Sequence, residues 1–142
     1  MKNEIIISRD FPKKVTPLIK QAKKSIDIIV FDWGWYPNEI GEAIQIFNNA
    51  IYNANLHGVH VRVITQKRLI KEILTRIGIQ AKLLHSSKLL HIKMMLIDGE
   101  IAILGSHNYT KNAFNLNYEV SVILRDAKSI AELQRYFDNI YM

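Results

Sequence analysis

Apolar and polar residues follow one another along the chain in blocks that predict strands and helices in succession. Short runs rich in Ile, Val and Leu, bounded by turn residues, indicate buried strands, and apolar residues at helical spacing indicate amphipathic helices. The expected strands are residues 4–8, 25–31, 59–65, 79–84, 91–97, 100–105 and 116–124, and the expected helices are 16–24, 38–56, 67–77 and 127–141. This succession predicts an α/β fold, a mixed β-sheet flanked by helices on both faces.

Two helix starts rest on capping signals. Thr16 precedes Pro17 and is the expected N-cap of the first helix, because proline is tolerated in the first turn of a helix. Asn38 follows a loop broken by Gly and Pro and is the expected N-cap of the second helix.

Length and composition restrict the class of protein. The chain has 142 residues, of which 49% are apolar and 23% charged, which is typical of a single globular domain over residues 1–142. It contains no cysteine, which excludes disulfides, Cys-ligated zinc and a thiol nucleophile. No apolar run is long enough to span a bilayer, and the N-terminus lacks the features of a signal peptide. We therefore expect a cytoplasmic protein without stable membrane association.

Four polar residues stand out in the apolar strands between residues 91 and 108. His91 and Lys93 are two residues apart in the run 91–97, so they point to the same face of a strand. A hairpin turn signal follows, and the returning strand leads into Ser106 and Asn108, again two residues apart. Pairing of the two strands would collect an imidazole, a cation and two hydrogen-bonding groups on one patch. This set is suited to binding and cleaving a phosphate ester.

The spacing of these residues resembles a known motif. The pattern His91-x-Lys93-x4-Asp98, followed by x6-Gly105-Ser106-x-Asn108, is similar to the HKD motif of the phospholipase D superfamily. The similarity continues through Tyr109-Thr110-Lys111, through Asn117-Tyr118-Glu119 and upstream through residues 58–64. It covers nearly the whole chain and is closest to the small non-specific bacterial endonucleases of that superfamily. The resemblance implies a phospholipase D-like domain and cleavage of phosphodiester bonds.

The candidate residues can divide this chemistry among themselves without a metal ion. Neutral His91 can attack phosphorus and form a phosphohistidine. Lys93 and Asn108 can bind the phosphate oxygens and stabilise the charge that develops on them, and Ser106 can donate a further hydrogen bond. The carboxylates are scattered along the sequence and no histidine pair has convincing zinc-ligand spacing. We therefore expect activity without a metal or other cofactor.

The reaction needs both a nucleophile and an acid, yet the chain has one motif. Large members of the superfamily carry two HKD motifs, whereas the small endonucleases pair two subunits, so the resemblance implies a C2 homodimer with a shared site. It also implies that Glu119 accepts a hydrogen bond from His91 and orients it. Asp98 belongs to the family motif, but its place before Gly99 predicts a turn role more than a chemical one.

The substrate is less well determined than the reaction. A net charge of +6 favours polyanions, so we expect nucleic acid, DNA and possibly RNA, cut with little sequence preference. Two alternatives stay open: a phospholipase acting on anionic lipid such as cardiolipin, and a nucleic-acid-binding module with an idle site. The aromatic residues Trp33, Trp35 and Tyr36 could stack on bases, or they could pack at the edge of the sheet or in the dimer interface. His107 occupies the variable position of the motif, and we expect its side chain to point away from the site.

Overall fold

The computed structural model describes residues 3–142, which form seven strands and five helices; strands and helices alternate except at β4, β5 and β6, which follow one another directly. The strands are β1 (Glu4–Ile7), β2 (Ser25–Ile29), β3 (His60–Thr65), β4 (Gln80–Leu83), β5 (Met94–Ile97), β6 (Ile101–Gly105) and β7 (Val120–Leu124). The helices are α1 (Asp10–Lys20), α2 (Ala43–Leu56), α3 (Arg68–Arg76), α4 (Lys111–Asn115) and α5 (Ala127–Tyr141).

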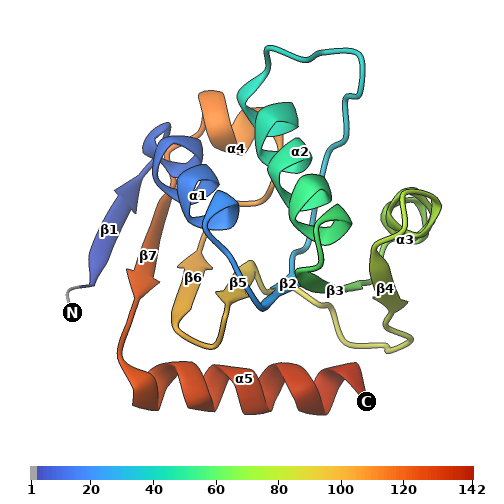
Figure 1. The fold of residues 1–142 in the computed structure, drawn as a ribbon, viewed down its shortest axis with the longest axis vertical. Helices are drawn as coiled ribbons and strands as arrows, with labels where there is room; N and C mark the ends of the chain where they lie inside the picture. Colours follow the sequence, from blue (N-terminus) through green and yellow to red (C-terminus); the bar gives the residue numbers. More distant parts are fainter. Residues whose placement is uncertain (1–2) are drawn as a thin grey trace.

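All seven strands of the described chain belong to one mixed sheet with the order β1-β7-β6-β5-β2-β3-β4. β2, β3 and β4 run parallel to one another, and the remaining neighbours are antiparallel. Helices α1, α2 and α4 lie on one side of the sheet and α5 on the other (Figure 1). The predicted mixed sheet with helices on both faces is therefore confirmed.

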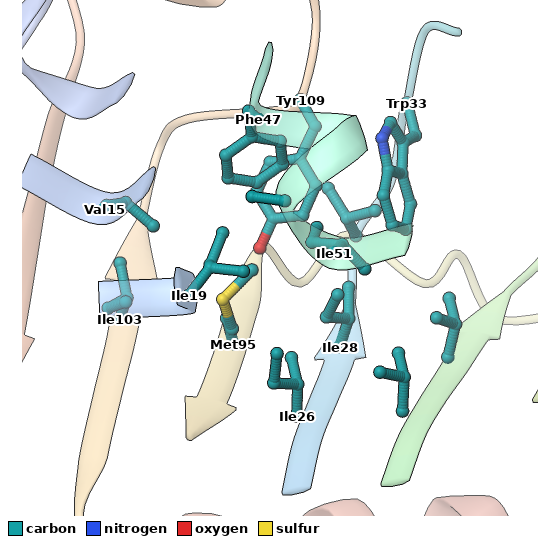
Figure 2. Close-up of a cluster of buried hydrophobic side chains, with 14 of the residues drawn as sticks. Val15, Ile19, Ile26, Ile28, Trp33, Phe47, Ile51, Met95, Ile103 and Tyr109 are labelled. Atoms are coloured by element: carbon teal, nitrogen blue, oxygen red, sulfur yellow. The ribbon is translucent and has the colours of Figure 1, made fainter. Parts of the chain in front are cut away.

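The two faces of the sheet bury separate apolar clusters. Ile26 and Ile28 of β2 point to the face covered by α1 and α2, where they lie with Ile19, Phe47 and other core residues (Figure 2). On the opposite face, Met94 and Leu96 of β5 pack with Ile130 and Phe137 of α5. β5 is therefore buried on both faces, which fixes its place in the middle of the sheet.

Helix α1 differs from its predicted boundaries at both ends. It begins at Asp10, so Thr16 is a buried residue inside the helix and not its N-cap. Pro12 occupies the first turn, where a missing N–H costs nothing. The helix ends at Lys20 because the next stretch is bound elsewhere: the backbone N–H groups of Lys23 and Lys24 donate to the Asp98 carboxylate.

Helix α2 begins at Ala43, later than the expected Asn38. Two polar side chains of α2 explain the shift, because they hold the preceding loop in a non-helical path. Gln45 Oε1 accepts a hydrogen bond from the Tyr36 N–H at 2.7 Å, and Asn48 Nδ2 donates to the Gly34 carbonyl at 2.9 Å. The predicted apolar helix position Ile40 is consequently 76% exposed.

Near the motif, the sequence pattern overestimated two strands and missed one helix. β5 begins at Met94 and β7 at Val120, so His91, Lys93 and Glu119 lie just outside the ladders. Residues 111–115 form the unpredicted helix α4, capped by the Thr110 side chain, which accepts from the Ala113 N–H. The N–H groups of Leu116 and Asn117 both donate to the Asn112 carbonyl at the end of this helix, so they cannot pair in the sheet and β7 begins later than predicted.

A close approach of two strands leads to the first prediction. Gly105 lies so near β7 that an added methyl group would overlap the Ser121 Cα and the Val120 carbonyl oxygen. We expect Gly105→Ala to lower the free energy of unfolding by about 1–3 kcal/mol, the usual cost of overpacking. Urea denaturation monitored by circular dichroism measures this change. Gly41→Ala is the control, because a methyl group there meets nothing within 4 Å; equal stability of the two variants would contradict the packing argument.

Candidate active site

All of the motif residues except Asp98 lie at one end of the central strands, where β2 and β6 end and β5 and β7 begin. Antiparallel pairing produces this arrangement: Met94 is opposite Leu104, and the Ser106 N–H donates to the Val120 carbonyl at 2.9 Å. The chain leading into β5 therefore lies beside the chain leaving β6. A shallow hollow opens at this end of the strands, and it is lined by His91, Ile92, Lys93, Leu104, Gly105 and Ser106.

His91 and Lys93 are in direct contact. The Lys93 Nζ lies 3.2 Å from each ring nitrogen of His91 and donates to the His91 carbonyl at 2.9 Å. The contact places the Lys93 ammonium directly against the His91 ring. Partial burial lowers the pKa of Lys93, and the nearby Glu119 charge partly offsets this effect. His91 itself is exposed and accessible to a substrate.

Ser106 and Glu119 form a second polar pair at the same end of the strands. Ser106 Oγ donates to Glu119 Oε1 at 2.5 Å and accepts from the Val120 N–H at 3.0 Å. The other carboxylate oxygen accepts from the Asn117 side chain at 3.0 Å. In the single chain the carboxylate of Glu119 is thus bound by Ser106 and Asn117, and its hydrogen bond to His91 stays a prediction.

Asn108 is held by the end of β2. Its Oδ1 accepts a hydrogen bond from the Asp32 N–H at 3.0 Å, which leaves the Nδ2 group as the donor of this side chain toward a ligand. The neighbouring Tyr109 is bound to the same segment, because its N–H donates to the Asp32 carbonyl and its own carbonyl accepts from Gly34. The site therefore joins two distant parts of the sequence.

Asp98 lies at the opposite end of β5 from Lys93 and does not line the hollow. Its carboxylate accepts hydrogen bonds from the backbone N–H groups of Lys23, Lys24 and Ser25 at 2.7–3.2 Å. Burial opposes ionisation, but these bonds outweigh it and hold the pKa of Asp98 below its usual value. This placement separates Asp98 from the other motif residues and gives it the structural role that its turn position indicated.

His107 points away from the hollow, as its place in the motif suggested. Its ring is buried and stacks on Phe11 at 4.5 Å, with its nitrogens bonded to Ser121 Oγ at 2.7 Å and the Ser8 carbonyl at 2.8 Å. Burial lowers the pKa of His107. The imidazole ties the turn after β6 to the ends of β1 and β7.

The aromatic residues after β2 pack within the protein. Trp33 is 3% exposed, donates its ring N–H to Asn48 at 2.6 Å and meets Tyr109 edge to face. Trp35 and Tyr36 are half-buried against the same cluster. Of the two readings the sequence left open, packing is the one the structure shows for Trp33.

Three residues near the hollow were not singled out from the sequence. Phe31 lies between His91, whose ring centroid is 5.2 Å away, and Lys67, whose Nζ is 4.8 Å from the Phe31 centroid. The Lys67 ammonium also forms an ion pair with Asp32 at 3.0 Å. Their place in the sequence could have indicated them, because all three follow the carboxyl ends of the neighbouring parallel strands β2 and β3, where ligands of α/β sheets commonly bind.

Comparison with known proteins places the chain in a family. The model of the family described as "Cardiolipin synthase, PLD-like domain" matches residues 15–141, so the chain belongs to this family of phospholipase D-like domains. The sequence is 34% identical over 132 residues to cardiolipin synthase from Geobacillus kaustophilus, covering 84% of this chain and 24% of that protein. It is 29% identical over 127 residues to mitochondrial cardiolipin hydrolase from Chlamydomonas reinhardtii, covering 84% and 52%. The chain thus spans about a quarter to a half of these relatives.

Two solved structures share the fold over almost their whole length. NucT from Helicobacter pylori has a TM-score of 0.80 at 21% identity and covers 99% of this chain and 95% of its own. Nuc from Salmonella typhimurium, a phospholipase D family member, has a TM-score of 0.81 at 20% identity, with coverage of 99% and 93%. At these identities the likeness concerns the fold. It confirms the phospholipase D-like architecture expected from the motif.

Two absences among the described residues concern membrane-spanning helices and metal sites. Between residues 3 and 142, no helix combines the length and apolar character needed to cross a membrane. Within the same range, no group of three or more His, Asp or Glu side chains is arranged to hold a metal ion.

The bonds of Asp98 lead to a prediction about stability. We expect Asp98→Asn to lower the free energy of unfolding by about 1–3 kcal/mol at neutral pH, because an amide has a single acceptor oxygen for these backbone donors. The folded-state pKa of Asp98 lies below the unfolded value of about 3.9. The stabilisation is therefore complete above that pH and is lost as the pH falls through the folded-state pKa. Urea unfolding at several pH values should show the difference from wild type shrinking in acid; a constant difference would contradict this role.

Proposed function

We propose that the chain is a metal-independent phosphodiesterase that cleaves nucleic acid with little sequence preference, with DNA as the first candidate substrate and RNA as the second. The observation that carries the proposal is the contact between His91 and Lys93 in an exposed hollow, with Ser106 at its rim and Asn108 held near by. An uncharged imidazole beside an ammonium is suited to attack a phosphate whose oxygens the ammonium neutralises. A net charge of +6 supports a polyanionic substrate.

The reaction consists of two displacements at phosphorus. A ring nitrogen of His91 forms a bond to phosphorus while the bond to the leaving oxygen breaks, and that oxygen takes a proton from a second imidazole. Water then attacks phosphorus, gives its proton to the second imidazole and releases His91. Lys93 and Asn108 bind the non-bridging oxygens in both steps, and Glu119 orients His91 once the site is assembled. The mechanism requires one imidazole to be neutral for the attack and the other to be protonated as the acid.

The second imidazole is assigned to His91 of a second copy of the chain. An uncovered apolar patch next to the site supports this homodimer. Ile7 and Val120 are paired across β1 and β7, and they are 58% and 57% exposed on the sheet face that α5 covers farther along. Half-buried Leu104 and Ile92 continue this patch into the hollow. A second copy seated there would bury the patch and bring two sites together.

The family relation favours a second candidate substrate. The matched relatives are named cardiolipin synthase and cardiolipin hydrolase, so an anionic phospholipid with a phosphodiester is the alternative. The same His91, Lys93 and Asn108 would carry out the same displacements on it. The apolar patch beside the hollow would then face lipid. Parallel assays on nucleic acid and cardiolipin vesicles separate the two candidates.

The nucleophile can be tested directly. Wild-type protein with excess EDTA should cleave labelled DNA, and a rapid alkaline quench should leave label on the protein that acid removes, as expected of a phosphohistidine. His91→Ala should abolish labelling and reduce cleavage by about 10⁴-fold or more, because both the nucleophile and the acid are lost. His60→Ala is the matched control, since His60 is the first residue of β3 and its ring bonds to the Gln80 side chain. Cleavage by His91→Ala near the wild-type rate would refute the assigned chemistry.

The dimer can be tested through the apolar patch. Light scattering at micromolar concentration should give twice the chain mass for the wild type. Val120→Lys should give the monomer mass and lose activity, because an ammonium cannot be buried unpaired in an apolar contact. Leu69→Lys is the control: Leu69 is 67% exposed on α3, away from the patch, and its variant should stay dimeric. A fully active wild-type monomer would rule out the shared site.

A further inference from the structure

We propose that Lys67 forms a second phosphate position, which binds a phosphate next to the one attacked by His91 in a nucleic-acid strand. We also propose that Asp32 competes with this phosphate for the Lys67 ammonium. The inference rests on the phosphodiesterase function proposed above and specifies how that site would bind a polymer.

The aromatic ring of Phe31 links Lys67 to the hollow. The Lys67 Nζ lies 4.8 Å from the ring centroid and the Lys93 Nζ lies 5.6 Å from it, while the His91 ring packs against the same ring at 5.2 Å. Two ammonium groups therefore share one ring beside the nucleophile, each at a distance typical of a cation–π contact. A substrate with a single phosphate can engage Lys93, whereas a strand with a phosphate at every nucleotide can engage both cations.

Hydrogen bonds fix the backbone of Lys67 near the site. The Gln66 side chain donates to the Lys88 carbonyl at 2.7 Å and accepts from the Leu90 N–H at 2.6 Å, directly before His91. The Lys67 N–H donates to the Oγ1 of the buried Thr65 at 3.0 Å. The fold therefore fixes the backbone of Lys67 beside the segment that carries His91.

Asp32 supplies the competing charge. Its Oδ1 lies 3.0 Å from the Lys67 Nζ, and the two side chains are 46% and 41% exposed. Such an exposed ion pair contributes little free energy, so a phosphate can displace it. The same oxygen accepts from the Trp33 N–H at 3.0 Å, which keeps the carboxylate in place when Lys67 turns to a phosphate. Asp32 thereby weakens anion binding at Lys67.

Beyond Lys67 the surface offers a path for the rest of a strand. A shallow hollow adjoins Gln66 and contains hydroxyl, imidazole and ammonium groups; it is lined by Gln66, Leu84, His85, Ser86, Ser87, Lys88 and Leu89. The Lys88 ammonium and the hydroxyls of Ser86 and Ser87 are groups that bind the phosphates and polar sugars of a strand. A nucleic-acid strand is therefore the occupant that we propose.

The variants Lys67→Ala, Asp32→Asn and their combination test the subsite, with Lys128→Ala as a control that removes the same charge from exposed α5. Binding is measured with a fluorescein-labelled single-stranded oligodeoxynucleotide in a His91→Ala background, and turnover with the oligonucleotide and with bis(p-nitrophenyl) phosphate. We expect Lys67→Ala to weaken binding about fivefold and to reduce the salt slope by about 0.7. Asp32→Asn should tighten binding, and the double variant should match Lys67→Ala because Asp32 acts through Lys67.

The ratio of kcat/KM on the two substrates separates the possible outcomes. A fall in the oligonucleotide-to-bis(p-nitrophenyl) phosphate ratio in Lys67→Ala, with none in Lys128→Ala, supports the subsite. An equal loss on both substrates overturns it, because Lys67 then acts on the attacked phosphate itself. Turnover of cardiolipin vesicles is measured in parallel, and a loss in Lys67→Ala confined to these vesicles overturns the nucleic-acid assignment. If the wild type cleaves neither test substrate, the proposed function fails and not only the subsite.

Discussion

The site depends on the antiparallel pairing of β5 between β2 and β6. β5 has only four residues, all buried, and its pairing places Met94 opposite both Ile29 and Leu104. One end of this strand presents His91 and Lys93 beside Ser106, and the other end carries Asp98. Because apolar clusters cover both faces of the strand, it cannot slip by one residue without moving its side chains to the wrong face. A rigid central strand thus positions the exposed His91, the nucleophile that we propose.

Charged groups at the site edge are held by short local contacts and not by burial. Lys93 is bound to His91, Lys67 to Asp32, and Glu119 to Ser106 and Asn117. Contacts between exposed groups cost little to exchange, so a phosphate can replace them without disturbing the sheet. The groups that define the backbone path are bonded differently: His107 is buried, and Asp98 collects several backbone N–H groups. Stability and ligand binding therefore rest on separate residues.

The family relation and the net charge of the chain direct attention to different substrates. The sequence relatives are named for cardiolipin, whereas a net charge of +6 favours a polyanion such as nucleic acid. The chemistry at phosphorus is common to both substrate classes, so the residues around the reacting group must discriminate between them. In the function that we propose for this chain, those residues are the cations beside Phe31 and the apolar patch around Ile7 and Val120.

The sequence by itself determined the features that local patterns encode. The apolar periods predicted the mixed sheet and the helix at 127–141, which begins after the N-cap Asp126, and the motif spacing predicted that His91, Lys93 and Ser106 would meet. Only the tertiary structure decided where α1 ends and where α2 begins, because bonds to Asp98, Gln45 and Asn48 override local sequence signals. It alone placed Phe31, Asp32 and Lys67 beside His91. These residues come from different strands, and the pairing of distant strands, unlike a helical or strand period, leaves no repeat in the sequence.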